Sequence, residues 1–465
     1  MSTPLTAEQK SIHFLNRTSF GVTRDTVQRV NQIGISAFLD EQLEPEKISD
    51  QSVEEKVSAL KTIRLNSGEL FELYPPPKVV RERGMTGDVM QAPRMIIYEL
   101  QQARLLRAVQ SQRQLNELMV DFWNNHFNIF AAKGADRWLT TSYDRDTIRP
   151  HALGKFRDLL LATAKSPAML FYLDNWLSVS PTARMPANAR RRGLNENYGR
   201  ELMELHTIGV DGGYTQRDVR EVARCFTGWT LLRPRGDAEF HFEPRLHDPG
   251  EKIVLGRRIA AGGMEDGLQV IDLLARHPST AKFIATKLAR RFVADDPPAA
   301  IVDRAADAFR RNDGDMRAVL RTIIDSPEFF SADFYRAKVK KPLEFAAGAL
   351  RITGADVKVT PQLIRYLARM GEPLFLAQPP TGYPDSASSW ISPDMLLTRM
   401  NFAADLVANR LPGASVAPEA LRNSQALIRM VAPDSLSPAT RRVLAEVDEK
   451  EAAALLLAAP EFQRR

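Results

Sequence analysis

The chain has 465 residues, of which 44% are hydrophobic and 26% are charged. This composition is ordinary for a folded globular protein and excludes a chain that is disordered throughout. The net charge of +6 comes from basic and acidic residues that are interleaved along the chain, so charge alone does not indicate a nucleic-acid partner.

The single cysteine, Cys225, excludes an intramolecular disulfide and any site in which cysteines hold zinc or an iron–sulfur cluster. It lies among apolar residues of a predicted helix and is expected to be buried. No apolar run approaches the roughly 20 residues that span a bilayer, and the first residues lack the pattern of a signal peptide. We therefore expect a cytoplasmic protein without membrane insertion.

Helical periodicity predicts an N-terminal helical segment over residues 1–90, which three prolines interrupt at 75–77. A central helical core is expected over residues 91–235, with long helices at 92–109 and 111–127. Near its end, Asn195 is a predicted helix cap, and Thr215 with Asp218 forms a capping box for the next helix. Gly199 costs about 1 kcal/mol relative to alanine inside a helix, so it indicates the close approach of another backbone.

Alternating apolar residues predict one small β-hairpin or structured loop near residues 238–259, within a segment at 236–260. Residues 261–465 are again helical, apart from a segment at 371–390 that is rich in proline, serine and aromatic residues. Phe375, Tyr383 and Trp390 give that segment apolar surface to bury, so we expect an ordered loop. The pattern predicts a mainly α fold, a large multi-helix bundle or array whose C-terminal region forms one compact unit with the core.

The predicted helix from Glu196 carries the most polar face. At about 100° per residue, Asn197, Glu201 and Glu204 share one narrow face, and Arg200 lies beside them. Such a carboxylate face can bind a metal or transfer protons, but it can equally be a solvated face held by ion pairs. His206 lies off this face, so a joint site would require the helix to distort or end near His206.

Another candidate is His126, which lies in DFWNNHF on the apolar side of its helix. A lone histidine in that position is more often a core residue than a ligand. Asp121, Asn124 and Asn125 lie away from the apolar side, and so many polar groups indicate a helix that lines a pocket.

His247 and Asp248 lie in a turn between the predicted strands, where functional groups are often presented, although aspartate is also a common turn residue. We expect a divalent metal, and nitrogen and oxygen donors without cysteine admit zinc, iron or manganese. The expected metal ligands are His126, His206, His247 and Glu204. The expected catalytic residues are Asn197, Arg200, Glu201, Glu204 and Asp248.

The run Arg190-Arg191-Arg192 forms either a solvated loop or an anion-binding lip beside the Asn195 segment. No nucleic-acid-binding motif accompanies it, so nucleic acid is not an expected partner. The chain also lacks the loop motifs that mark nucleotide sites and hydrolase nucleophiles.

Several blocks of the sequence, in order, resemble the bacterial domain of unknown function 1800 family. They include DFWNNHF (121–127), NENYGRELMELHTIGVDGGYTQRDVREVARCFTGW (195–229), HDPGEKIVLG (247–256), KKPLEF (340–345) and PPTGYPD (379–385). The resemblance implies a mainly α-helical bacterial protein but carries over no catalytic residue. It also implies a companion of the domain of unknown function 1501 family, which is sulfatase- or phosphatase-like by resemblance and commonly bears an export signal.

Two hypotheses of function follow. In the first, the chain is an enzyme whose His, Glu and Asp residues converge on one polar pocket, which a metal can complete. In the second, it is a non-catalytic partner of the companion, and export together with that companion would place it in the periplasm.

Overall fold

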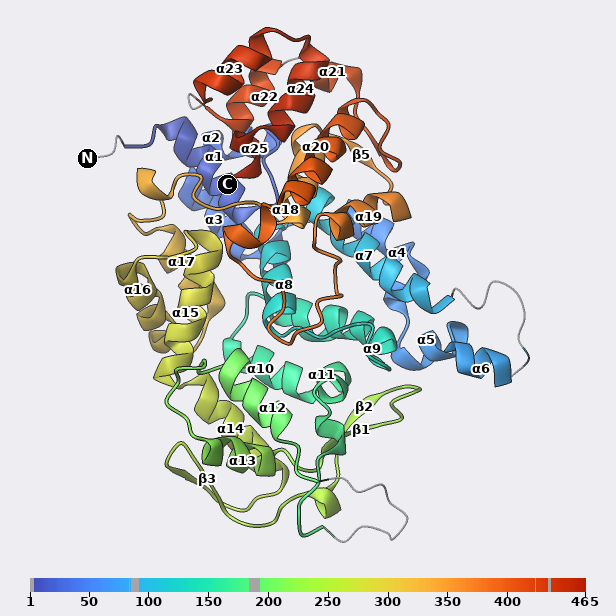
Figure 1. The fold of residues 1–465 in the computed structure, drawn as a ribbon. Coiled ribbons are helices and arrows are strands. Elements are labelled where there is room, and N and C mark those ends of the chain that lie inside the picture. The colour runs from blue at the N-terminus through green and yellow to red at the C-terminus, as the bar shows by residue number, and fades with distance from the viewer. Residues whose placement is uncertain (1–3, 83, 85–91, 184–192, 423, 434–435) are drawn as a thin grey trace.

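The predicted mainly α fold is confirmed in a computed structural model, which describes residues 4–82, 84, 92–183, 193–422, 424–433 and 436–465 (Figure 1). Apolar residues that recur at helical spacing bury one face of most helices, and most of these faces meet in one large core that runs from Ile12 to Phe462. A small separate cluster contains Leu70, Ile96 and Trp138. Each of the four predicted segments contributes to this core. The run Arg190-Arg191-Arg192 lies outside the described residues.

Short helices of the N-terminal region pack against two longer ones. Thr6 and Thr23 begin the first two helices with capping boxes, and α3 and α4 contact α8 and α7 respectively. The helices are α1 (Ala7–Thr18), α2 (Arg24–Ile33), α3 (Ile35–Leu43), α4 (Gln51–Ser58), α5 (Ser67–Leu73), α6 (Pro77–Glu82), α7 (Ala92–Gln110) and α8 (Gln114–His126).

The two helices predicted after Asn195 are present and pack against each other. Asn195 caps the first helix, and Thr215 with Asp218 forms the predicted capping box of the second. A Cβ on Gly199 would lie 2.9 Å from the carbonyl oxygen of Val219, which is the close backbone approach that this glycine indicated. The central helices are α9 (Asp136–Ser142), α10 (Phe156–Lys165), α11 (Pro167–Tyr172), α12 (Glu196–Glu201) and α13 (Gln216–Cys225).

The predicted β region is confirmed and is more extensive than the sequence indicated. Strand β1 (Trp229–Leu232) pairs antiparallel with β2 (Glu239–Phe242), and β3 (Lys252–Val254) pairs antiparallel with β4 (Arg257–Ile259). A third antiparallel pair joins β5 (Asp356–Val357) to β6 (Ala414–Ser415). Strands of two residues are too short to show an alternation, so no sequence pattern could predict this pair.

Proline begins many of the later helices, where its fixed φ suits the first turn and its missing N–H is not needed. The helix α18 is buried along its whole length. The helices are α14 (Met264–Ala275), α15 (Pro278–Phe292), α16 (Ala299–Arg311), α17 (Met316–Ile324), α18 (Pro342–Ile352), α19 (Pro361–Arg369), α20 (Pro393–Val407), α21 (Pro418–Leu421), α22 (Ser424–Val431), α23 (Pro438–Ala445), α24 (Glu449–Ala458) and α25 (Pro460–Gln463).

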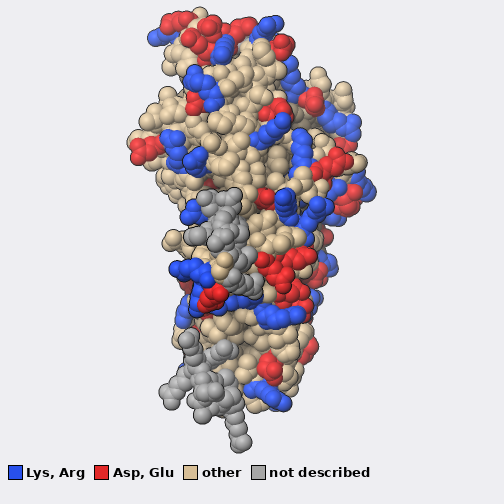
Figure 2. Space-filling model, turned by 90° about the vertical axis from the view of Figure 1, so that its right-hand side faces the viewer, with Lys and Arg blue, Asp and Glu red and all other residues tan. Residues whose placement is uncertain are grey.

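Basic and acidic side chains are interleaved on the face of the molecule that Figure 2 shows. Within the described ranges, every helix is too short or too polar to cross a membrane.

Candidate functional site

The helices α7, α8 and α18 come together near the middle of the molecule (Figure 1). A polar hollow opens between α7, α8, the start of α18 and the 371–390 segment. Its volume is about 40 Å³, which is room for a few water molecules or for the reacting group of a larger molecule. The side chain of Asp121 on its wall is 17% exposed, so solvent reaches the hollow. Its lining consists of Arg104, Asp121, Asn124, Asn125, Asn128, Ile129, Lys341, Glu372, Leu374, Phe375 and Tyr383.

Arg104, on α7, organises one wall of the hollow. Its guanidinium donates to Asp121 Oδ1 at 3.2 Å and to Asp144 Oδ1 at 2.6 Å. Burial acts to raise the pKa of Asp144, but Arg149 and Arg104 outweigh it and lower this pKa to about 2. Asp144 is therefore ionised at neutral pH, and it holds the guanidinium of Arg104 against the hollow.

Two asparagines of the DFWNNHFN stretch fix the 371–390 segment as the opposite wall. Asn125 Nδ2 donates to the carbonyl of Tyr383 at 2.8 Å, and Asn125 Oδ1 accepts from the N–H of Tyr383 at 2.7 Å. Asn128 donates to two further carbonyls of the segment, at 2.8 and 3.0 Å. Gly382 has φ +70°, and a Cβ there would overlap the carbonyl oxygen of Asn125. The segment is therefore an ordered loop fitted closely to α8.

Glu372 brings an unusual carboxyl group to the hollow. The residue is 4% exposed, and its Oε2 accepts from the N–H of Leu343 at 2.8 Å, at the start of α18. Burial, and after it the charge of Asp121, raises the pKa of Glu372 to about 8, although Lys341 opposes the shift. This carboxyl group is therefore mostly protonated at neutral pH and can donate a proton.

Lys341 supplies a fixed positive charge to the same wall. It occupies the cap position of α18, and its ammonium pairs with Asp385 Oδ1 at 2.6 Å. Burial acts to lower the pKa of Lys341, but Asp385 outweighs it and raises this pKa. Lys341 and Arg291 in turn overcome the effect of burial and hold the pKa of Asp385 well below its usual range. Both partners of this ion pair are thus charged.

The histidines His126 and His206 lie together, with ring centroids 6.2 Å apart. His126 Nε2 lies 3.1 Å from the carbonyl of His206, and Nδ1 lies 2.9 Å from Lys287 Nζ. A carbonyl only accepts and an ammonium only donates, so Nε2 carries the proton and Nδ1 accepts. Burial, followed by the charge of Lys287, lowers the pKa of both rings, that of His206 to about 3. Both imidazoles are neutral at pH 7.

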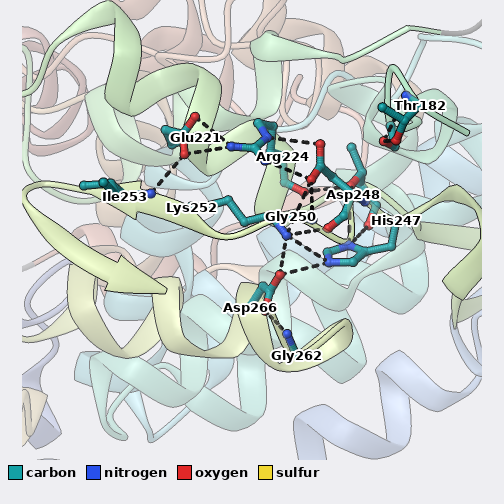
Figure 3. A network of polar contacts seen from close by, with 12 residues as sticks. Thr182, Glu221, Arg224, His247, Asp248, Gly250, Lys252, Ile253, Gly262 and Asp266 are labelled. Atoms are coloured by element: carbon teal, nitrogen blue, oxygen red, sulfur yellow. Dashed lines mark hydrogen bonds and ion pairs between the residues drawn. The ribbon is translucent and has the colours of Figure 1, made fainter. Parts of the chain in front are cut away.

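His247 and Asp248 belong to a different cluster, beneath the β3–β4 hairpin (Figure 3). His247 Nδ1 lies 2.7 Å from the carbonyl of Thr227, and Nε2 lies 2.9 Å from Asp266 Oδ2, which Lys252 also contacts at 2.5 Å. Asp248 accepts from Arg224 through both carboxylate oxygens, at 2.9 and 3.0 Å. The two residues therefore tie the hairpin to α13 and α14.

The polar face of α12 and of the turn that follows it is partly exposed, and it lies outside the hollow. Arg200 donates to Gln216 at 2.7 Å, and Asn197 reaches a backbone carbonyl at 3.4 Å. Burial, and then the charge of Glu204, raises the pKa of Glu201. A π-helical turn over Leu202–His206 follows α12, and it is the distortion that a joint site with His206 would require.

None of the predicted metal ligands or catalytic residues lines the hollow. In the part of the chain that the structure describes, no group of three or more His, Cys, Asp or Glu side chains is arranged to hold a metal ion. The metal centre predicted from His126, His206, His247 and Glu204 therefore finds no support in these residues and stays a prediction.

Comparison with known families identifies the chain. Residues 13–464 match the model of a family described as a protein of unknown function (DUF1800). The chain belongs to this family. No curated protein and no solved structure matches it.

In this DUF1800 chain, the hollow draws on three of the sequence blocks that carried the resemblance. DFWNNHF supplies Asp121, Asn124 and Asn125, whose position away from the apolar side predicted a pocket-lining helix. KKPLEF supplies Lys341, and PPTGYPD supplies Tyr383. The polar residues inside those two later blocks were the sequence signal that could have placed Lys341 and Tyr383 in the site. Arg104 and Glu372 lie outside the blocks, and no local pattern distinguishes them from ordinary surface charges.

Proposed function

We propose that the chain is an enzyme that performs general acid–base catalysis in the hollow, with Glu372 as the acid and Asp121 as the base. The proposal is supported by two carboxyl groups that line one small hollow in different electrostatic surroundings. Burial, and then the charge of Asp121, raises the pKa of Glu372 to about 8, whereas Asp121 is in an ion pair with Arg104 at 3.2 Å. Acid–base enzymes use pairs of carboxyl groups whose surroundings differ in this way.

The fixed charges indicate the kind of substrate. Arg104 and Lys341 place a guanidinium and an ammonium at the hollow, where they would stabilise negative charge that develops on a reacting oxygen. Asn124 offers an amide on the same lining. The hollow admits only a small group, so the substrate presents a compact polar end, such as a carbonyl or phosphoryl group. Glu372 gives a proton to the reacting or departing oxygen, and Asp121 takes a proton from the attacking nucleophile. Asp121 then releases its proton to solvent and Glu372 takes one up, which restores the starting state.

The test uses the purified chain and a bacterial metabolite extract, followed by mass spectrometry of the small molecules. We expect at least one polar metabolite to be converted by the natural chain. The change Glu372→Gln or Asp121→Asn should lower that conversion by about 100-fold or more, because each removes one proton-transfer group. Glu41→Gln, at an exposed glutamate outside both proposed sites, is the control and should leave the conversion unchanged. Full conversion by both hollow variants would contradict the proposal.

The carboxylate face of α12 and the metal predicted with it form a second proposed site. Its support is that burial, and then the charge of Glu204, raises the pKa of Glu201, and that His206 lies near His126, with ring centroids 6.2 Å apart. The same conversion is measured with added zinc, iron or manganese. Metal-dependent conversion that Glu204→Gln or His126→Gln abolishes, and that Glu372→Gln leaves intact, would favour this site over the hollow.

A second function, assembly with the companion protein, is supported by exposed apolar side chains. Ile391, Leu397 and Met400, at and just before α20, are 46%, 57% and 51% exposed. We propose that this patch contacts the companion. Co-expression and affinity purification should recover both proteins together, and the double change Leu397→Glu with Met400→Glu should separate them. Fractionation of cells with and without the companion would show whether the complex reaches the periplasm. No recovery of the companion with the natural chain would reject this function.

A further inference from the structure

A second charged cluster, apart from the hollow's lining, lies where α1, α15, α18 and the residues after α25 meet (Figure 1). Arg17, Arg291 and Arg465 in this cluster are each at most 3% exposed. Arg291 pairs with one oxygen of Glu344, and Arg465 lies 3.0 Å from the other. Arg465 also donates to the carbonyl of Arg291 at 3.1 Å. These contacts place two guanidiniums on a single carboxylate.

Arg17 brings a third buried guanidinium near this pair, because the charges of Arg465 and Glu344 both act on it. Burial, and then the charge of Arg465, lowers the pKa of Arg17, while Glu344 acts in the opposite direction. The structure gives Arg17 one hydrogen bond, to the carbonyl of Phe334 at 2.8 Å. Its Nε and Nη1 are buried without a hydrogen-bond partner among the described residues.

Other donors in the cluster are unused as well. Nε and Nη2 of Arg291 and Nη1 of Arg465 are buried and have no hydrogen-bond partner in the described part of the chain. The other carboxylates nearby are engaged elsewhere, since Asp295 pairs with Lys338 and Asp385 pairs with Lys341. Buried charges are normally paired, and buried N–H groups normally have an acceptor. Three guanidiniums near one side-chain carboxylate, with several N–H groups unused, depart from both expectations.

We propose that Arg17, Arg291 and Arg465 hold a small inorganic anion in the interior of the protein. A halide or a tetrahedral oxyanion such as phosphate or sulfate would accept from the unused N–H groups and offset the surplus positive charge. This inference does not rest on the proposed catalysis. It bears on the hollow nonetheless, because Glu344 accepts from the N–H of Lys341 at 2.9 Å. The anion would thus brace the start of α18, from which the ammonium of Lys341 reaches the hollow.

The first test is thermal unfolding of the full chain at constant ionic strength. Potassium gluconate, whose anion is too large for an interior site, is replaced stepwise by chloride, sulfate or phosphate. A specific site should raise the unfolding temperature by roughly 3 °C with saturation, and the most effective anion identifies the class. Arg17→Met should abolish the rise. Arg107→Met is the matched control, because Glu54 pairs with Arg107 through both oxygens at 2.8 Å, and it should keep the rise.

A second measurement decides the matter even where Arg17→Met does not fold. Crystals of the natural chain grown with bromide should show an anomalous peak within hydrogen-bond distance of the Arg17 guanidinium. Crystals grown with sulfate or phosphate should show tetrahedral density there if the site takes an oxyanion. An unfolding temperature that is the same in every salt at fixed ionic strength, together with only water density beside Arg17, would overturn the proposal.

Discussion

Two buried groups of charges in this chain, one beneath the β3–β4 hairpin and one around the hollow, are built on different plans. The hairpin cluster contains an arginine, a lysine, a histidine and three carboxylates, and each carboxylate has contacts with basic side chains or backbone N–H groups (Figure 3). No atom of the cluster is among the unpaired buried groups of the described residues. Its members are Glu221, Arg224, His247, Asp248, Lys252 and Asp266.

The hollow is not closed in this way. Glu372 is protonated because burial and Asp121 raise its pKa to about 8, and Arg104 divides its donors between Asp121 and Asp144. A volume remains beside these groups. The comparison teaches that buried charge alone does not distinguish a structural cluster from a site. A perturbed proton affinity next to accessible space is the more informative combination.

The largest effect is expected in the hairpin cluster. Lys252 and Asp266 are both fully buried and contact each other at 2.5 Å. Lys252→Met would leave part of the Asp266 charge unpaired and should lower the free energy of unfolding by about 4 kcal/mol. Urea unfolding measures this change. The double variant Lys252→Met with Asp266→Leu removes both charges and should recover most of the loss. A Lys252→Met variant as stable as the natural chain would show that the hairpin cluster does not depend on this ion pair.

The hollow should instead make the stability of the chain depend on pH. Folded Glu372 keeps its proton up to about pH 8, whereas an ordinary glutamate loses it near 4.5. The folded state therefore binds more protons between these values, and the free energy of unfolding falls as pH rises through this window. Glu372→Gln should remove about 3 kcal/mol of that fall between pH 5 and 8.

Urea unfolding at several pH values measures the slope. Glu41→Gln, at an exposed glutamate, is the control and should keep the slope of the natural chain. If the free energy of unfolding depends on pH in the same way in the natural chain and in Glu372→Gln, the carboxyl of Glu372 ionises normally. Glu372 could then not be the proposed general acid.

The sequence predicted those features of the fold that depend on residues close together in the chain. The caps at Asn195 and Thr215, the close approach at Gly199 and the buried Cys225 all depend on a few neighbouring residues, and all are present. The pocket-lining side of α8 was also visible, because helical spacing fixes which side chains share a face.

The candidate site could be predicted only in part, because it is assembled across the chain. Asn125 meets Tyr383 over 258 positions, and Glu372 meets the start of α18 over 29. The polar stretch after Asn195 drew attention because its signals are contiguous. The sequence could not show that burial raises the pKa of Glu372, because the neighbours that bury it come from distant segments.

Two glycines extend the comparison to the backbone. Gly382 beside the hollow and Gly256 in the β3–β4 hairpin both have positive φ, at +70° and +74°. A Cβ at Gly382 would meet the backbone of Asn125, whereas a Cβ at Gly256 would meet nothing within 4 Å. Gly256→Ala should therefore cost about 1 kcal/mol of unfolding free energy from backbone strain alone. Gly382→Ala should cost about 2 kcal/mol more and should also lower the conversion described above. Equal costs in urea unfolding would show that the 371–390 segment is free to move away from α8.

The smallest effect is expected at the carboxylate face of α12. Burial, and then Glu204, raises the pKa of Tyr214, and glutamine keeps the size and polarity of the Glu204 side chain. Glu204→Gln should therefore change the free energy of unfolding by less than about 0.5 kcal/mol. The measurement is urea unfolding with and without added zinc, with Glu41→Gln as the exposed reference. A loss near that of Lys252→Met, or a zinc-dependent stabilisation that only the natural chain shows, would mean that this face binds a ligand. The segment after Asn195 would then be a better candidate for the functional site than the hollow.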